Sequence, residues 1–172
     1  MTAESRTIAI RVDGAEHGLS VDPRRTLLDL LREQLGVFSA KKGCDHGQCG
    51  ACTVLVDGRR VLACLTLAVT CDGSEVTTAA GLAAEGELHP IQQAFLEHDA
   101  FQCGHCTPGQ ICSAVGLSAE FAAGRPSHVT APVAATPDWT DAEIAERMSG
   151  NLCRCGAYPG IVAAIRAAGG TP

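Results

Sequence analysis

The first eighty residues carry short runs in which apolar and polar positions alternate, the pattern of half-buried β-strands. In residues 7–12 every second position is Ile or Val, and the turn pair Asp13-Gly14 follows directly. Residues 17–21 can therefore pair back on this run as a β-hairpin. The same pattern predicts further strands at residues 52–56, 60–64 and 75–78, with Asp57-Gly58 as the turn between the first two.

One amphipathic helix interrupts the strands. Residues 26–35 hold leucines at positions 27, 28, 30, 31 and 35, and Gly36 closes the run. A hairpin, a helix and then more strands is the element order of a β-grasp ferredoxin domain of the plant type. We predict such a domain over residues 1–80.

The second half of the chain changes to helical periodicity. Four helices are predicted, over residues 89–96, 108–123, 141–148 and 161–168, the last one stopped by Gly169-Gly170. Residues 124–138 contain three prolines, which indicates a surface excursion. Four short helices predict a small four-helix bundle over residues 87–172. The predicted fold class is therefore α+β, with a domain boundary among the glycines and alanines of residues 79–87.

Composition narrows the class of protein. The 172 residues are 46% hydrophobic, which excludes a largely disordered chain. The best apolar run, residues 61–69, falls well short of the roughly 18 residues that a membrane-spanning helix needs. The net charge is −6 and no basic stripe is visible, so nucleic acid is not an expected partner. Only six residues are aromatic, so the core buries little area per residue and the ten cysteines are the obvious additional support.

The cysteines are clustered rather than spread, unlike those of a secreted disulfide scaffold. The first set has the spacing C-x4-C-x2-C-x11-C and consists of Cys44, Cys49, Cys52 and Cys64. C-x4-C-x2-C is the spacing of a plant-type [2Fe-2S] loop, whereas structural zinc usually takes two C-x2-4-C pairs. Gly43, Gly47 and Gly50 can turn backbone N–H groups toward the sulfurs. Cys64 is expected to supply the fourth thiolate from a neighbouring strand.

A second set combines C-x2-C with C-x-C, and each pair directly precedes a predicted helix. Its members are Cys103, Cys106, Cys153 and Cys155. Helix N-termini present free N–H groups and positive dipole, which suits an anionic cluster. Taken alone, this spacing fits zinc nearly as well as iron. The first set in the same short chain favours a second [2Fe-2S] cluster.

Two histidines and two cysteines remain to be interpreted. His46 and His105 each follow a cysteine as in half of a Rieske site, but the matching C-x2-H half is absent and each set already has four cysteines. We interpret both histidines as loop-filling or interface residues. Cys71 and Cys112 fall outside both sets and are interpreted as small buried hydrophobes.

Three stretches carry a family resemblance. Residues 42–54, 101–110 and 150–156 hold all but one of the eight cysteines of the two sets. They resemble the iron–sulfur subunit of the molybdenum hydroxylases, such as xanthine dehydrogenase, aldehyde oxidoreductase and carbon monoxide dehydrogenase. Within that family, Pro-Gly-Gln-Ile-Cys at 108–112 and the proline-containing insert are most similar to the small subunit of bacterial periplasmic aldehyde oxidoreductases.

The sequence departs from that subgroup in two ways. No export signal precedes residue 7, which favours the cytoplasm unless a signal peptide has been removed and the protein is periplasmic. His105 stands between Cys103 and Cys106, where the family usually has an aromatic or apolar residue.

The resemblance implies a role in electron transfer. A large subunit would bind molybdopterin and oxidise an aldehyde to a carboxylic acid, and a medium subunit would bind FAD, in a heterotrimer or a dimer of heterotrimers. Two [2Fe-2S] clusters in this chain would pass electrons singly between them, the second set lying beside the pterin and the first nearer the flavin. Gln102 and Cys155 would lie close enough to hydrogen-bond the pterin. No catalytic residue for substrate chemistry is expected in this chain.

Two other classes of protein remain open. A freestanding two-cluster ferredoxin would shuttle between unrelated enzymes, but charge-steered encounters predict a more acidic surface than a dispersed net charge of −6. A zinc-stapled interaction module would have no redox role, and the iron and sulfide content would distinguish it from the other two.

Overall fold

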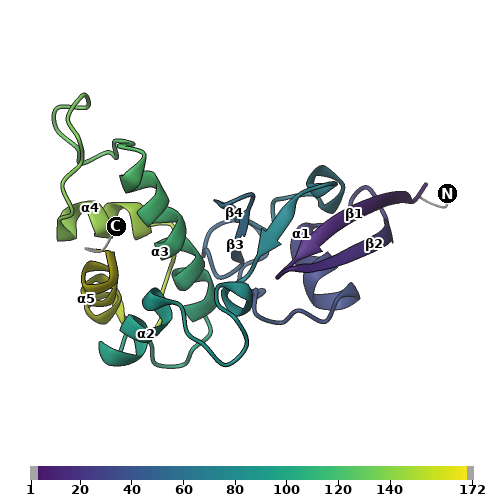
Figure 1. The fold of residues 1–172 in the computed structure, drawn as a ribbon, viewed down its shortest axis with the longest axis horizontal. Helices are drawn as coiled ribbons and strands as arrows, with labels where there is room; N and C mark the ends of the chain where they lie inside the picture. Colours follow the sequence, from purple (N-terminus) through teal and green to yellow (C-terminus); the bar gives the residue numbers. More distant parts are fainter. Residues whose placement is uncertain (1–3, 170–172) are drawn as a thin grey trace.

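The computed structural model describes residues 4–169; residues 1–3 and 170–172, which include the predicted helix stop Gly170, lie outside this part. A five-stranded mixed sheet occupies one end of the molecule and a group of helices the other (Figure 1). The strands are β1 (Arg6–Val12), β2 (Ala15–Val21), β3 (Thr53–Val56), β4 (Arg59–Leu62) and β5 (Glu75–Thr77), in the order β2-β1-β5-β3-β4. β1 and β5 are parallel and the other pairs are antiparallel. The predicted α+β class is confirmed.

Both predicted turns form two-residue hairpin connections. Asp13 and Gly14 have φ values of 48° and 82°, and Asp57 and Gly58 have 49° and 74°. Two successive positive φ values match the right-handed twist of the flanking strands, and Asp-Gly pairs adopt them at low cost. These turns fix the register of β1 with β2 and of β3 with β4.

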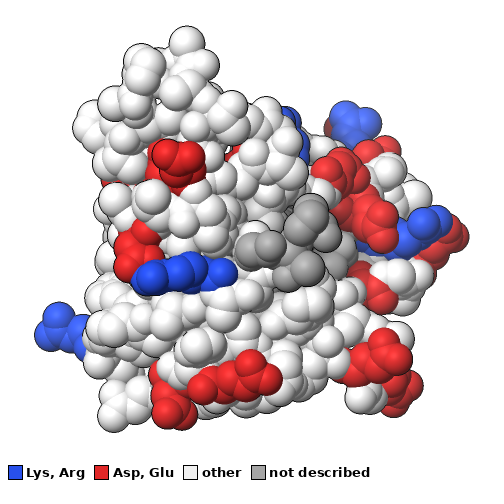
Figure 2. Space-filling model, turned by 60° about the vertical axis from the view of Figure 1, so that its left-hand side comes forward, with Lys and Arg blue, Asp and Glu red and all other residues white. Residues whose placement is uncertain are grey.

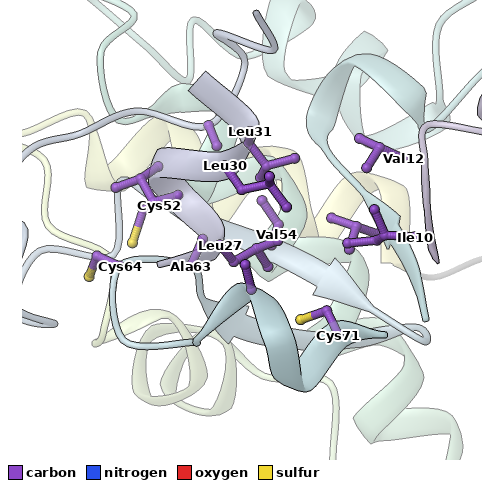
Figure 3. Close-up of a cluster of buried hydrophobic side chains, with 14 of the residues drawn as sticks. Ile10, Val12, Leu27, Leu30, Leu31, Cys52, Val54, Ala63, Cys64 and Cys71 are labelled. Atoms are coloured by element: carbon purple, nitrogen blue, oxygen red, sulfur yellow. The ribbon is translucent and has the colours of Figure 1, made fainter. Parts of the chain in front are cut away.

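The helix predicted over residues 26–35 is split in two. α1 (Leu27–Asp29) has Thr26 as its N-cap, and a π-helical turn, η1 (Leu30–Gln34), follows directly. All four leucines from Leu27 to Leu31 are buried in the core beneath the sheet (Figure 3). The apolar spacing over so few residues cannot distinguish an α-turn from a π-turn. The sequence therefore predicted which face is buried but not the wider π-helical turn.

Two further details of the sheet half differ from the prediction. The strand expected at residues 60–64 ends at Leu62, so Cys64 lies beyond the strand, where the backbone turns back and Leu65 N–H donates to Leu62 O over 2.9 Å. Two short 3-10 helices, η2 (Ala68–Cys71) and η3 (Ala79–Gly81), were not predicted. Segments of three or four residues are too short to show a helical period.

The helical half contains α2 (Pro90–Glu97), α3 (Thr107–Ala122), α4 (Asp141–Met148) and α5 (Tyr158–Gly169). The predicted helices form, although α5 begins three residues before the expected start at 161. Thr140 caps α4 by accepting from Glu143 N–H, and a capping box between His89 and Gln92 opens α2. None of the helices in residues 4–169 combines the length and the apolar character needed to cross a membrane.

Buried side chains form two cores. The first lies under the sheet and includes Cys52, Cys64 and Cys71, and the second lies among the helices and includes Cys112 and Cys153. Leu55 of β3 packs into the helical core, and α3 lies against β3, so the two halves share a packed contact. The domain limits of 1–80 and 87–172 stay a prediction.

Ion pairs join the two halves and anchor the excursion between α3 and α4. Arg60 of β4 donates to both carboxylate oxygens of Glu120 on α3, over 2.8 and 2.9 Å. Arg147 of α4 contacts Glu120 and the buried Glu143, and it donates to the backbone carbonyl of Arg125 at the start of the excursion. The loop that projects beyond the helices in Figure 1 therefore has a charged, buried base.

We expect Arg147→Met to lower the free energy of unfolding by roughly 3–5 kcal/mol, because it leaves the Glu143 carboxylate buried without its cation. The side chains of Arg147 and Glu143 are only 4% and 6% exposed. Arg166→Met is the matched control, since its ion pair with Asp141 lies on the surface and is worth at most about 1 kcal/mol. Urea titrations followed by circular dichroism would measure both, and equal losses would contradict the prediction.

Candidate metal centres

The eight cysteines of the two predicted sets lie as four neighbouring thiol pairs, in each of which one thiol shifts the pKa of the other. The pairs are Cys44 with Cys49, Cys52 with Cys64, Cys103 with Cys155, and Cys106 with Cys153. The two members of each of the last two pairs come from segments 52 and 47 residues apart in the sequence. Each predicted set is therefore brought together as two pairs of sulfur atoms.

The loop of the first set wraps backbone donors around its thiols. Gln48 N–H donates to Cys44 Sγ over 3.2 Å, and Cys44 N–H donates to Cys49 Sγ over 3.4 Å. Gly47, with φ +83°, supplies a left-handed turn that a side chain would strain. Gly43 is needed for a different reason: a Cβ there would lie 2.9 Å from Cys49 Sγ. The glycines expected from the sequence thus serve both turning and close approach.

The inner pair of the first set sits at the edge of the sheet core. Cys52 directly precedes β3 and Cys64 follows β4, and Ala63 N–H donates to Cys52 O over 3.3 Å. Figure 3 shows both sulfurs at one edge of the core, with the Cys71 sulfur apart from them. The β3–β4 hairpin therefore positions Cys64, although the residue itself lies in the following turn and not, as expected, on a strand.

The second set is built at the start of two helices. Cys106 is the N-cap of α3, and Gly104, with φ 78°, turns the loop between Cys103 and Cys106. Ahead of α5, Ala157 N–H donates to Cys153 Sγ over 3.4 Å, and Tyr158 Oη accepts from Cys153 N–H over 2.8 Å. The start of α5 thus presents a backbone N–H group to Cys153 Sγ, as the sequence indicated.

Each set has a more buried inner pair and a more accessible outer pair. In the first set Cys52 and Cys64 are buried, and in the second Cys103 and Cys155 are exposed. Burial raises the pKa of the Cys52 thiol to about 12 and that of Cys106 to about 11. A backbone N–H from His46 lowers the pKa of the Cys44 thiol to about 6. The buried thiols need a bound cationic centre to exist as thiolates at neutral pH.

The pairwise arrangement fits a binuclear cluster. In a [2Fe-2S] cluster four thiolates are shared between two irons, two to each. Single zinc instead needs its ligands to converge on one ion. The donor sets therefore suit iron–sulfur clusters, which supply one-electron redox chemistry when bound, better than zinc.

Both sets border one cavity. A space of about 410 Å³ is lined by thiols of the first set and by thiols of the second. The lining cysteines are Cys44, Cys49, Cys103, Cys106 and Cys153. His105 also lines it, and its Nε2 lies 3.8 Å from the point that a Cβ on Gly43 would occupy. The imidazole thus belongs to the space between the two loops, whereas the His46 ring contacts Cys44 O within its own loop.

Backbone contacts set the two loops against each other. Leu152 N–H donates to Cys49 O over 2.9 Å. A Cβ on Gly50 would lie 2.4 Å from Gly150 O, and a Cβ on Gly109 would lie 2.4 Å from Gly50 O. The sequence indicated that Gly50 turns the loop, but it did not indicate that Gly109 allows the loop to approach α3. A glycine in a predicted helix does not reveal which distant segment packs against it.

The remaining predicted residues lie at the surface or in the cores. Gln102 and Cys155 are exposed, and their predicted contact with a pterin stays a prediction. Cys112 and Cys71 are buried in the helical and sheet cores, as the sequence indicated. Burial raises the pKa of the Cys112 thiol to about 12, which makes it an inert thiol at neutral pH.

Comparison with known proteins points in the same direction. Residues 10–69 match the 2Fe-2S iron-sulfur cluster binding domain and residues 78–166 match the [2Fe-2S] binding domain. The chain is 58% identical to the aldehyde oxidoreductase iron-sulfur-binding subunit PaoA of Escherichia coli K12, over 97% of this chain and 73% of that protein. It is 43% identical to the nicotinate dehydrogenase small FeS subunit of Eubacterium barkeri, over 93% and 92%.

Solved structures share the fold. Quinoline 2-oxidoreductase from Pseudomonas putida 86 aligns with a TM-score of 0.78 and 36% identity, over 94% of this chain and 90% of that chain. Aldehyde oxidoreductase from Desulfovibrio gigas aligns with a TM-score of 0.80 and 36% identity, over 95% of this chain and 17% of that longer chain.

A β-grasp half and a helical half, each matching a [2Fe-2S] domain, define an electron-transfer protein with two iron–sulfur centres. The chain belongs to the iron–sulfur small subunits of the molybdenum hydroxylase family, an oxidoreductase family, so the resemblance seen in the sequence is confirmed. As a subunit of this kind it works with larger partners.

Gly109→Ala should destabilise the protein by roughly 1–3 kcal/mol, because its methyl group would overlap backbone oxygens of the first loop. Alanine's better helix propensity, worth about 1 kcal/mol, opposes this loss only in part. Gly150→Ala is the control: it has open space and no left-handed φ, so its effect should stay within about 0.5 kcal/mol. Urea denaturation would measure both, and a Gly109→Ala variant as stable as the parent would contradict the tight docking.

Proposed function

We propose that this chain carries electrons one at a time from a molybdopterin centre in a large subunit to FAD in a medium subunit. Cys103, Cys106, Cys153 and Cys155 would hold the cluster that receives them, and Cys44, Cys49, Cys52 and Cys64 the cluster that passes them on. The observation that carries this proposal is that two four-thiol sets border one cavity of about 410 Å³. Gly43, Gly47 and Gly50 shape the loop of the first set.

The surface around the second set supports docking of the large subunit there. The exposed outer pair, Cys103 and Cys155, lies beside the exposed Gln102. Next to it an apolar groove of about 440 Å³ is lined by Phe101, Gly104 and residues of α2. Apolar patches of this kind on a redox protein are typical of partner interfaces. Gln102 and Cys155 would then contact the pterin.

The first set has its own accessible apolar border, which supports docking of the medium subunit. Leu65 is exposed and directly follows Cys64. It also packs against Gly47 of the ligand loop. A partner that covers the Leu65 side chain would bring its cofactor close to the first cluster.

The reaction served would be oxidation of an aldehyde to a carboxylic acid in the large subunit. Support comes from the name of the 58% identical relative, an aldehyde oxidoreductase subunit. Such an oxidation releases two electrons, and a chain with two one-electron centres can carry both. We also propose the cytoplasm as the compartment, because a reducing environment keeps the eight ligand thiols reduced.

A freestanding two-cluster ferredoxin is the second candidate. Transient carriers depend on charge for their encounters. The face of the helical half drawn in Figure 2 is mostly uncharged, with acidic and basic side chains scattered around it. This surface favours a fixed subunit over a charge-steered carrier, and co-purification with both partners would distinguish the two.

The purified chain should contain about four iron atoms and show two distinct S = ½ signals by EPR after anaerobic reduction with dithionite. Two binuclear clusters in separate environments require both results. Iron quantified on the same sample is the measurement. A silent sample that contains zinc would exclude the redox proposal and indicate a metal-stapled interaction module.

Cys153→Ser should remove one of the two EPR signals, leave the other and interrupt electron flow from molybdenum to flavin in the assembled complex. Serine lacks the thiolate that the second cluster needs. Cys112→Ala is the matched control, because Cys112 is equally buried in the helical half but belongs to no thiol pair in the described residues. Loss of both signals in Cys153→Ser, with the sheet half still folded, would contradict two independent sites.

A further inference from the structure

One buried amide joins the two ligand loops. Asn151 is 6% exposed and stands two residues before Cys153. Its Nδ2 donates to Gly50 O over 3.0 Å and to Thr53 Oγ1 over 3.2 Å. Its Oδ1 accepts from Ser113 Oγ over 2.6 Å. The side chain therefore uses both of its N–H donors toward the sheet half and its oxygen toward α3.

The partners of Asn151 adjoin ligands of both proposed clusters. Gly50 lies between Cys49 and Cys52, and Thr53 directly follows Cys52. On the helical side, Gln110 Nε2 of α3, four residues after Cys106, donates to the backbone oxygen of Asn151 over 3.0 Å. A shift of this one residue would move the loops of the two sets relative to each other.

The surroundings of Asn151 leave it little freedom to adjust. Gln110 and Ser113 are each 1% exposed. Among the described residues, the buried polar side-chain atoms without a partner are Thr107 Oγ1 and Trp139 Nε1, so every member of the Asn151 network is satisfied. Fully satisfied buried networks rigidify a structure and specify one arrangement. Leucine or alanine at position 151 would leave Gly50 O and Thr53 Oγ1 with fewer donors.

The ion pair between the two halves is a link of a different kind. Arg60 and Glu120 form an ion pair whose side chains are each 23% exposed. It joins β4 to the later part of α3, and neither residue lies next to a proposed ligand in the sequence. This pair can hold the halves together without fixing the distance between the thiol sets.

We propose that Asn151 is the positioning residue that fixes the separation and orientation of the two clusters, and through them the rate of electron transfer between them. The inference rests on the proposed function, since it assumes that both thiol sets hold clusters. The physical reason is that transfer between two redox centres slows steeply as their distance grows, so a relay needs a rigid spacer. The Asn151 amide and its two hydrogen bonds to the first loop, at Gly50 O and Thr53 Oγ1, form that spacer.

The test compares the parent chain with Asn151→Asp, both loaded with clusters. Aspartate has the same shape, but it replaces the amide donor with an oxygen that repels Gly50 O. Two readouts apply: the dipolar splitting between the two EPR signals of the dithionite-reduced chain, and the rate of electron equilibration between the clusters after pulse radiolysis. We expect a changed splitting and a transfer rate several-fold lower, with both signals retained.

Two controls separate positioning from general stability. Ser113→Ala removes the third hydrogen bond of the Asn151 side chain, the one to α3. It leaves the two contacts of Asn151 with the first loop, so it should lower the urea midpoint and keep the splitting. Arg60→Met breaks the ion pair between the halves and should also keep the splitting. A splitting that changes as much in either control as in Asn151→Asp would overturn the assignment.

The remaining outcomes are decisive. If Asn151→Asp keeps the parent splitting and rate, the positioning role is wrong while the proposed relay stands. If Asn151→Asp loses a cluster, Thr53→Val is the second test, because it removes one hydrogen-bond acceptor of the Asn151 amide. A changed splitting in Thr53→Val supports the inference. An unchanged splitting overturns it. A parent chain without two EPR signals overturns the proposed function itself and the inference with it.

Discussion

The close approach of the first ligand loop to the start of α3 is the constraint on which the rest of the structure depends. The carbonyl of Gly50 lies where a side chain at Gly109 would have to be, and Gly150 O approaches Gly50 just as closely. Backbone packs on backbone here, so the two thiol sets share one cavity instead of being separated by a layer of side chains. The two hydrophobic cores are thereby held together at the place where both thiol sets lie.

The clusters also complete those cores. Aromatic residues are scarce in this chain, and the buried hydrophobic groups are mainly aliphatic. Cys52 and Cys64 belong to the sheet core and Cys153 to the helical core. Because burial raises the pKa of an inner thiol such as Cys52, its thiolate form depends on the bound metal. Cluster binding and folding are therefore expected to stabilise each other.

Within each set, one pair of cysteines lies deeper in the protein than the other. Inner cysteines are held by hairpin and helix backbone, while the outer pair of the second set reaches the surface beside an apolar groove. If the large subunit docks here as proposed, it would exclude water from the exposed sulfurs and bring its own redox centre within reach. Cluster ligation and subunit docking would then depend on the same few residues around Cys103 and Cys155.

The sequence by itself determined the element order, both Asp-Gly turns and the two sets of cysteines, because strand periodicity, turn chemistry and ligand spacing are local properties. It placed Cys64 on a strand, missed the π-turn after α1, and attached no role to Gly109 or Asn151. Only the tertiary structure decided that Cys103 pairs with Cys155 and Cys106 with Cys153. It also decided that one amide bridges both loops. These contacts join segments 38 to 101 residues apart, and no local pattern records which atoms will meet there.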